Sequence, residues 1–309
     1  MHLKTRGLMM ELISDSQALL NANYSQLSVN FNTEYGVLWS QLMQDEVPCF
    51  NLQLLNEAQQ HQDAIENSGG QVWVDGQMHT IRYSVSSSLK PGIFSLGGQL
   101  SLFRDLIKAQ DRDALMHYGT ECINMLFPRL NHYYLPITTI ALVQGSALGG
   151  GFEGALANDV IIAEKGCQMG FPEILFNLFP GMGAYNLLAR KVGVALAEKM
   201  ILSGKIYSSD ELYEMGVVDV LAEPGSGVQA VYDFVVKHDR RANGIRAVQQ
   251  VRNSLNQITY GDLMQVIRIW VDAALRLNEK DLKIMDRFVR AQEKAFLGGQ
   301  DKRQDCFIA

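Results

Sequence analysis

Apolar positions along the chain fall first into short segments with the spacing of β-strands. Residues 72–74 and 78–85 alternate apolar and polar positions on either side of an Asp-Gly pair at 75–76. Such a pair suits the positive φ angles of a tight turn, so this region predicts a β-hairpin. Two further runs, 137–143 and 160–163, are mostly apolar and β-branched. They predict buried strands of a core sheet.

Longer segments repeat apolar residues at helical spacing. Two of them, about 99–108 and 111–132, lie between the hairpin and the first core strand, and Pro136 ends that helical run. From about Ala184 the chain is almost wholly helical in pattern, and 259–297 holds a long amphipathic stretch. This order of elements predicts an α/β fold with a helical C-terminal part.

These patterns divide the chain into four parts. The first part, 1–30, is polar and rich in Asn, Ser and Gln, which predicts an N-terminal extension. An α/β core is expected over 31–205, a helical region over 206–297 and a tail over 298–309. We expect the core to hold the active site.

The composition is that of an ordinary globular protein. The chain has 309 residues, of which 47% are hydrophobic and 19% charged, and its formal net charge is −6. No basic block stands out, so we expect neither nucleic acid nor a membrane as partner. No apolar run approaches the roughly 18 residues of a spanning helix, and we expect a cytoplasmic protein. The cysteines are far apart and no histidine has metal-ligand spacing, so no metal is expected.

A glycine-rich helix start is the first candidate for chemistry. Gly149, Gly150 and Gly151 lie where a helix should begin after a buried strand, although each costs about 1 kcal/mol relative to alanine inside a helix. Some group must therefore approach this backbone closely. A helix N-terminus offers unpaired amide hydrogens and a partial positive charge, which suits an oxygen that becomes negative during a reaction.

Two glutamates accompany this helix start. Glu153 lies one turn into the helix, and Glu173 follows a Pro-marked bend beside the apolar run 174–179. An apolar pocket disfavours the charged form of a glutamate, so its pKa rises towards the range of a general acid or base at neutral pH. A glutamate near a helix N-terminus can instead serve only as a partner of the helix dipole. The two residues by themselves leave both interpretations open.

The same glycines also fit the fingerprint of a dinucleotide-binding fold. Gly149, Gly151 and Gly154 have the spacing G-x-G-x-x-G after a strand, and an acidic residue follows about 20 positions later. In that fold the acid ends the next strand, whereas the predicted strand ends at Glu164 and Glu173 lies beyond it. The mid-chain position also counts against a nucleotide, so we expect no cofactor at these glycines.

Longer motifs around these residues resemble those of the crotonase, or enoyl-CoA hydratase, superfamily. The run VQGSALGGGFE at 143–153 is similar to the segment with one catalytic glutamate, and FPEI at 171–174 to the segment with the second. The run FSLGGQ at 94–99 resembles the loop that supplies an oxyanion-hole amide. The resemblance implies that Glu153 and Glu173 are the catalytic side chains. It also implies that the backbone N–H groups of Gly98 and Gly150 form the oxyanion hole.

Further details resemble one branch, the diffusible-signal-factor synthases of Gram-negative bacteria. Gln99 stands where the hydratase loop usually has an aspartate, and Phe152 replaces a small residue. The resemblance covers about residues 30–295 and implies a spiral core of repeated ββα units. Three further runs are similar to that branch: FNLFPGMGAY at 176–185, GVLW at 36–39 and PCF at 48–50.

The resemblance implies an enzyme that makes a cis-2-unsaturated fatty acid for quorum sensing. It would dehydrate a 3-hydroxyacyl thioester of acyl carrier protein and then hydrolyse the cis-2-enoyl thioester. The acyl group would be carried on phosphopantetheine, with no other cofactor. Crotonases form trimers or hexamers through their C-terminal helices, and related synthases have a sensor-kinase domain as regulatory partner. A fatty chain needs an apolar slot, for which we expect Leu148, Met182 and Trp270.

Two alternatives stay open. One is an enoyl-CoA hydratase or isomerase that acts on acyl-CoA and releases no free acid. The other is a non-catalytic crotonase-like binding protein, against which the intact pair Glu153 and Glu173 counts. The sequence sets neither the length of the acyl chain nor which glutamate takes which proton, because two interacting carboxyl groups titrate as a pair.

Overall fold

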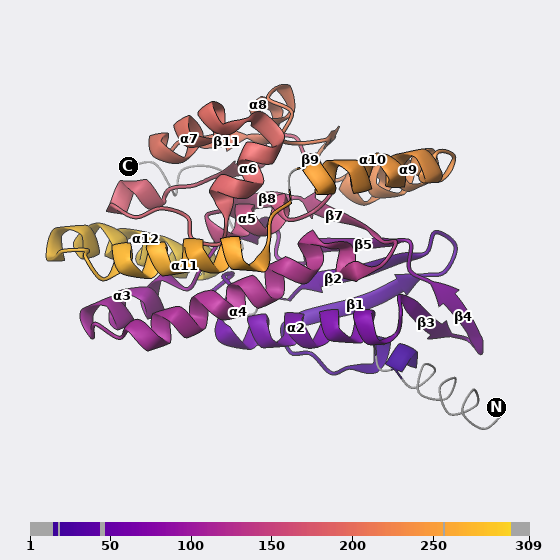
Figure 1. The fold of residues 1–309 in the computed structure, drawn as a ribbon, viewed down its shortest axis with the longest axis horizontal. Coiled ribbons are helices and arrows are strands. Elements are labelled where there is room, and N and C mark those ends of the chain that lie inside the picture. The colour runs from indigo at the N-terminus through magenta and orange to yellow at the C-terminus, as the bar shows by residue number, and fades with distance from the viewer. Residues whose placement is uncertain (1–14, 18, 44–46, 256, 298–309) are drawn as a thin grey trace.

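The computed structural model describes residues 15–17, 19–43, 47–255 and 257–297. The predicted tail and much of the predicted N-terminal extension therefore lie outside the described residues. The described chain forms β-sheets covered by helices, which confirms the predicted α/β class (Figure 1).

The larger sheet lies at the centre of the fold. β1 is antiparallel to β2, and every other neighbouring pair in this sheet is parallel. The predicted strand 137–143 corresponds to β7, which is buried along its whole length, and this burial explains its apolar and β-branched sequence. The strands of the larger sheet are, in spatial order, β1 (Leu27–Asn32), β2 (Val37–Leu42), β5 (Tyr83–Ser88), β7 (Thr138–Val143), β9 (Val160–Glu164) and β12 (Val220–Ala222).

The smaller sheet repeats the order of the larger one. Its strands are, in spatial order, β11 (Ile206–Ser208), β10 (Gln168–Gly170), β8 (Gly145–Leu148) and β6 (Gly92–Ser95). β10, β8 and β6 run parallel, and β11 is antiparallel to β10. β6 follows β5, β8 follows β7 and β10 follows β9, and a helical segment comes after each pair. This succession gives the expected repetition of ββα units.

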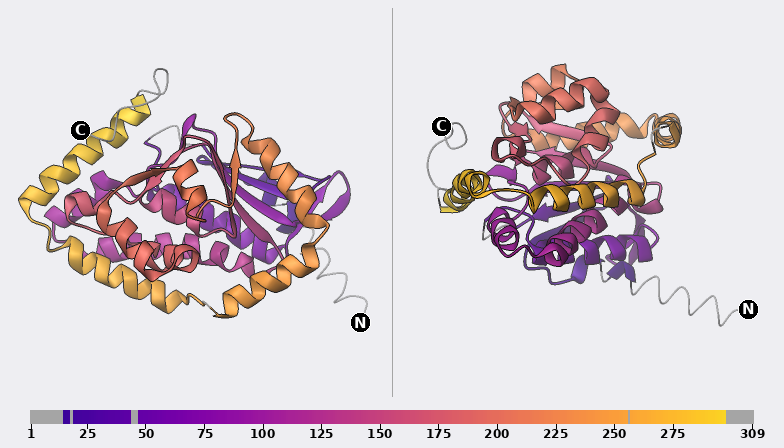
Figure 2. Two further views of the ribbon diagram at one scale, coloured as in Figure 1. Left: turned by 90° about the horizontal axis from the view of Figure 1, so that it is seen from above. Right: turned by 60° about the vertical axis from the view of Figure 1, so that its left-hand side comes forward.

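The C-terminal helices lie across the helices of the core. α11 packs against α4, and α12 packs against α3 and η2. In Figures 1 and 2 these two helices lie between α3 and α4 on one side and α6 and α7 on the other. The helical segments around the site are α2 (Leu52–Asn67), α3 (Leu100–Lys108), α4 (Arg112–Leu130), α5 (Gly150–Leu156), η2 (Glu173–Phe176), α6 (Ala184–Val192), α7 (Val194–Ser203), α11 (Tyr260–Ala274) and α12 (Glu279–Leu297).

The predicted β-hairpin is confirmed. β3 (Gln71–Val74) pairs with β4 (Gln77–Thr80), and Asp75 and Gly76 between them have φ angles of 48° and 80°. The predicted second strand, 78–85, covers the end of this hairpin and the start of β5 in the larger sheet. The alternation of apolar and polar residues thus continues across two separate strands. Strands of different sheets share the same two-residue period, so the pattern alone does not show where one strand ends.

Several elements differ from the sequence-based expectation. β1 begins inside the predicted extension 1–30, so residues 27–30 form part of the larger sheet. β11 and β12 lie in the segment expected to be helical, and each is three residues long, too short for a periodic signal. β8 precedes α5 where a direct entry into a helix was expected, and the amphipathic stretch 259–297 divides into α11 and α12 near Leu275.

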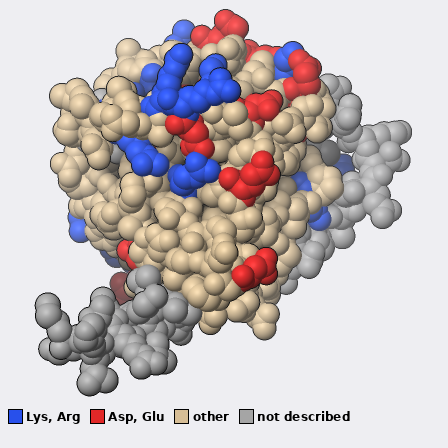
Figure 3. All heavy atoms as spheres, turned by 90° about the vertical axis from the view of Figure 1, so that its right-hand side faces the viewer, with Lys and Arg blue, Asp and Glu red and all other residues tan. Residues whose placement is uncertain are grey.

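Charged side chains of both signs lie on the surface. On the face shown in Figure 3, Lys and Arg side chains gather in one region with Asp and Glu side chains beside them. Charges also attach α9 (Gly227–Asp239) and α10 (Ala242–Leu255) to the core. Asp239 accepts hydrogen bonds from Arg82 and the Tyr83 hydroxyl, and Arg252 donates to the buried Asp159 at 2.6 Å. No helix among the described residues is long and apolar enough to cross a membrane.

Candidate active site

The two glycines expected to form an oxyanion hole meet where the loop after β6 reaches the start of α5. A Cβ added to Gly150 would lie 3.4 Å from the nitrogen of Gly98, so the two backbone N–H groups are close together. Within the part of the chain that the structure describes, neither N–H donates a hydrogen bond to another protein group. Both donors are therefore available to a single substrate oxygen.

The neighbouring glycines make this close approach possible. Gly97 has a φ of +87°, and a Cβ there would lie 2.7 Å from the carbonyl oxygen of Leu148. A Cβ on Gly151 would lie 2.3 Å from the carbonyl oxygen of Ser95. These two glycines are thus explained by close backbone contacts around the β6 loop and the start of α5, which leave no room for a side chain.

Glu153 is fixed by the backbone of a neighbouring loop. The residue is 1% exposed, and its Oε1 accepts hydrogen bonds from the N–H groups of Met182, at 2.7 Å, and Ala184, at 2.8 Å. Burial raises the pKa of Glu153 to about 8, and the two N–H groups oppose that rise. This carboxyl group can therefore gain or lose a proton near neutral pH from a defined position.

Glu173 lies on η2, against the backbone at the start of α5. A Cβ on Gly149 would lie 2.4 Å from its Oε1, so a side chain there would displace this carboxyl group, and the φ of +53° at Gly149 also favours glycine. Burial, and secondarily the negative charge of Glu153, raises the pKa of Glu173 to about 8. Its Oε2 is buried and has no hydrogen-bond partner among the described residues. Leaving a buried polar atom unpaired costs about 1–3 kcal/mol, so this oxygen suits a group that the substrate supplies.

The two carboxyl groups influence each other's ionisation, and they titrate as a pair. Burial raises both pKa values towards the neutral range, so a carboxyl group of the pair can hold a proton near neutral pH. One member can then act as a general base while the other acts as a general acid. A paired base and acid beside the N–H groups of Gly98 and Gly150 can make and stabilise an enolate.

A single pocket of about 640 Å³ connects these groups, a volume typical of pockets that bind small molecules. Most of its wall is apolar. The structure brings all the site residues predicted from the sequence to this pocket, although their catalytic and binding roles stay predictions. They are Gly98, Leu148, Gly150, Glu153, Glu173, Met182 and Trp270.

Trp270 reaches the pocket because α11 packs tightly on the loop before α6. A Cβ on Gly181 would lie 2.6 Å from the Trp270 ring, and one on Gly183 would lie 2.5 Å from the Leu263 side chain. The ring of Phe103 meets Trp270 edge to face, with centroids 5.0 Å apart. The Gly-Met-Gly run at 181–183 thus lets a C-terminal helix close one side of the pocket.

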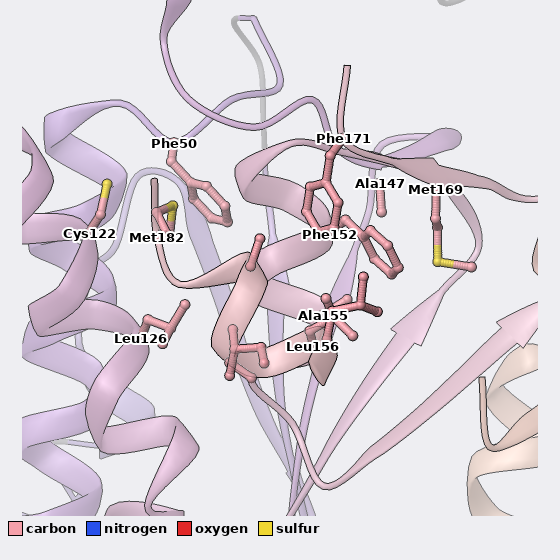
Figure 4. Packing of buried hydrophobic residues seen from close by; sticks show 14 of the residues in the cluster. Phe50, Cys122, Leu126, Ala147, Phe152, Ala155, Leu156, Met169, Phe171 and Met182 are labelled. Atoms are coloured by element: carbon pink, nitrogen blue, oxygen red, sulfur yellow. The ribbon is translucent and has the colours of Figure 1, made fainter. Parts of the chain in front are cut away.

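Phe152, which stands where the hydratase motif has a small residue, lies behind the site. It is fully buried, and its ring packs on Phe171 with centroids 4.9 Å apart. Figure 4 shows this pair on the other side of α5 from Met182 and Cys122. Phe152 therefore supports α5 from the core and does not line the pocket.

Sequence reasoning missed several residues that line the pocket. Tyr118 and Cys122 come from α4, while Ile284, Phe288 and Gln292 come from α12. The α12 residues are four positions apart, which is the spacing of one helix face. This signal was present, but a helix stripe that lines a pocket has the same period as one that packs into a core.

Comparisons with known proteins agree with this arrangement. Residues 80–289 match the family model described as enoyl-CoA hydratase/isomerase. The peroxisomal fatty acid beta-oxidation multifunctional protein AIM1 of Arabidopsis thaliana is 35% identical over 134 residues, which are 43% of this chain and 18% of that relative. The chain therefore spans less than a fifth of that relative's length.

Solved structures share the fold at low identity. The structure of Pseudomonas aeruginosa DspI has a TM-score of 0.62 and 23% identity, over 80% of this chain and 94% of its own. Enoyl-CoA hydratase from Bacillus halodurans has a TM-score of 0.69 and 20% identity, over 85% and 99%. Human mitochondrial delta3-delta2-enoyl-CoA isomerase has a TM-score of 0.70 and 14% identity, over 87% and 99%. These likenesses show the crotonase fold alone.

The family match includes both glutamates and the glycine-rich start of α5, the groups that meet at the pocket. It covers more than half of the chain, and the architecture of two parallel sheets joined by ββα units agrees with it. This chain belongs to the enoyl-CoA hydratase/isomerase family.

Proposed function

We propose that this enzyme converts a 3-hydroxyacyl thioester into a free cis-2-unsaturated fatty acid that serves as a diffusible signal. The observation that carries the proposal is the meeting, at one apolar pocket, of two buried glutamates and two backbone N–H groups that donate to no protein group among the described residues. The run at 176–185, similar to that of the signal-factor synthases, supports the narrower assignment. It supplies Met182 and the N–H groups that hold Glu153.

The first half of the reaction is a dehydration. One carboxylate removes an α-proton, and the electrons of that C–H bond move towards the thioester oxygen, held by the N–H groups of Gly98 and Gly150. The enolate then expels the 3-hydroxyl group, which leaves as water with a proton from the other carboxyl group. The pair ends with the same number of protons as it began, because one carboxyl gains the proton that the other loses.

The second half is the hydrolysis of the thioester. A carboxylate takes a proton from water as its oxygen bonds to the carbonyl carbon, and the same two N–H groups hold the tetrahedral oxyanion. The C–S bond then breaks, and the thiol of the carrier leaves with a proton from the pair. The Cys122 thiol lines the pocket, but burial raises its pKa above its usual range and disfavours the thiolate, so water is the favoured nucleophile.

An incubation with 3-hydroxyacyl carrier proteins of several acyl lengths tests the proposal. We expect a free cis-2-enoic acid, identified by mass spectrometry and by the coupling constant of the alkene protons. The variants Glu153→Gln and Glu173→Gln serve as controls for contaminating thioesterases. Release of saturated or 3-hydroxy acid alone, with no enoyl product, contradicts the proposal.

A second candidate function uses the same site without hydrolysis. An enoyl-CoA hydratase or isomerase needs the same base, acid and oxyanion donors, and the family match favours it equally. Accumulation of an enoyl thioester with no free acid, or faster turnover of acyl-CoA than of the carrier protein substrate, identifies this second function.

The acyl donor and the setting of the enzyme belong to the same proposal. We propose acyl carrier protein or coenzyme A as the thioester carrier and a homo-oligomer, a trimer or hexamer, as the working form. A cytoplasmic location and control by a sensor-kinase domain accompany the signal-synthase assignment. Analytical ultracentrifugation of the purified protein tests the oligomeric state.

A further inference from the structure

Gln292 joins the C-terminal helix to the loop that carries one oxyanion donor. It lies on α12, is 5% exposed and lines the pocket. Its Nε2 donates hydrogen bonds to the carbonyl oxygens of Leu96, at 2.9 Å, and Gly98, at 3.0 Å. One carboxamide nitrogen has two hydrogens, so it can make both bonds at once.

The two carbonyl groups held by Gln292 lie on either side of the peptide that carries the Gly98 N–H. The carbonyl between them, that of Gly97, accepts a hydrogen bond from the N–H of Phe50 at 2.8 Å. Three successive carbonyl groups are thus occupied by partners from α12 and from the segment before α2. The orientation of the Gly98 N–H follows from the directions in which these carbonyls are held.

Within this loop, the Gly97 N–H donates a hydrogen bond to the Ser95 hydroxyl at 3.3 Å, but the two glycines themselves contribute no side-chain contact. Gly97 has a φ of +87°, and neither it nor Gly98 has a side chain that could pack or form a hydrogen bond. Glycine backbones have the widest choice of conformations, so contacts from outside must select one. An oxyanion hole depends on that selection, because its donors act only when they already point at the developing charge.

We propose that Gln292 is a positioning residue that holds the Gly98 N–H towards the thioester oxygen. The inference rests on the proposed function in one respect, because it takes from it that the Gly98 N–H stabilises an enolate or oxyanion. It holds for the dehydratase and for the hydratase alternative, because both reactions pass through that charge.

The test uses α-proton exchange, which needs the base and the oxyanion hole but no leaving group. Full-length wild type and Gln292→Met are incubated in D₂O with dodecanoyl-CoA, and deuterium at the α-carbon is followed by mass spectrometry. Methionine keeps the length of the side chain and removes the donor. We expect kcat for exchange to fall by about 10- to 100-fold, part of the 10²–10³-fold loss that removal of a whole oxyanion donor causes. KM should stay within about 3-fold.

Gln62→Met is the matched control. Gln62 is 4% exposed, and its Nε2 donates to the carbonyl oxygen of Met125 at 2.7 Å, between α2 and α4 and away from the pocket. The variant Gln62→Met loses the same kind of buried hydrogen bond as Gln292→Met. We therefore expect it to lower the melting temperature and to leave kcat within about 2-fold of the wild type. This control separates loss of alignment from loss of stability.

The outcomes distinguish the inference from its premise. An unchanged kcat in Gln292→Met, with wild-type exchange intact, overturns the positioning role and leaves the proposed function standing. Equal losses of kcat in Gln292→Met and Gln62→Met also overturn it, because general destabilisation then explains both. If the wild type exchanges no α-proton, the enolate chemistry of the proposed function fails, and the role of Gln292 fails with it.

Discussion

Glu153 and Glu173 have the same side chain but different surroundings. Two backbone N–H groups occupy one oxygen of Glu153, whereas Oε2 of Glu173 is buried and has no partner within the described part of the chain. Burial is the main cause of the raised pKa in both. At this scale the chemistry depends on which oxygens remain open to the substrate as well as on residue type.

Replacing either glutamate by glutamine should lower turnover by at least about 100-fold, the usual scale for loss of a general acid or base. Glutamine keeps the size of the side chain but cannot take up or release the proton. Turnover of Glu153→Gln and Glu173→Gln is measured with the thioester that the wild type converts, and thermal melting controls for the fold. Wild-type turnover with an unchanged melting temperature would refute the catalytic assignment.

The raised pKa of Glu153 also predicts how stability depends on pH. Because its folded pKa, about 8, lies above the unfolded value near 4.5, the folded state binds more protons between these values. The wild type should therefore lose stability as pH rises from about 5 to 8, whereas Glu153→Gln lacks this contribution. We expect the melting temperature of the variant, relative to wild type, to be higher at pH 8 than at pH 5 by at least about 2 °C. A constant difference between the two pH values would contradict the raised pKa.

At the scale of elements, β8 and α5 place the apolar pocket beside the N–H groups of Gly98 and Gly150. Leu148 ends β8, lines the pocket and presents its carbonyl oxygen to Gly97. The pocket continues along α4, α11 and α12, which meet it from different parts of the chain. The proposed function therefore predicts that the accepted length of acyl chain depends on how these helices pack.

Enlarging Leu148 to Trp should reject long acyl chains more than short ones. Added volume meets close-packed walls at a cost of about 1–3 kcal/mol, and a short chain does not reach the obstruction. The measurement is kcat/KM for a series of acyl lengths on wild type and Leu148→Trp, with melting temperature as control. Equal loss at every length would mean that Leu148 acts through the neighbouring Gly150 and not through the chain.

At the scale of the whole molecule, packing gives the glycine-rich segment a role other than nucleotide binding. Gly97, Gly149 and Gly151 stand where a Cβ would collide with Leu148, Glu173 and Ser95, respectively. Gly149 and Gly151 belong to the G-x-G-x-x-G run, so two of its three glycines have an explanation inside this protein that involves no pyrophosphate.

We accordingly predict that neither NAD nor NADP binds at 149–154. Calorimetric titration of the purified protein with each nucleotide should show no binding at micromolar concentrations, while a long-chain acyl-CoA gives a measurable heat. Micromolar binding of NAD or NADP that Glu173→Gln alters would restore the dinucleotide interpretation.

The sequence by itself determined the elements with strong local periods and the residues with unusual local chemistry. The hairpin, the strands at 138–143 and 160–164, and helices α3 and α4 follow from spacing, because neighbouring residues decide which face they bury. The glycine-rich motif and both glutamates stand out as short local motifs, and their expected catalytic role came from the resemblance of these motifs to those of the crotonase superfamily. Short strands such as β11 and β12 were not, because three residues carry no period and depend on a partner strand.

Only the tertiary structure decided which residues meet. Gly98, Trp270 and Gln292 are far apart in sequence and line one pocket, and no local pattern encodes that approach. The raised pKa values of the glutamates likewise depend on burial by distant segments. Whether a helix stripe faces a core or a substrate is settled by what packs opposite it, so the roles of α11 and α12 could be assigned only from the folded chain.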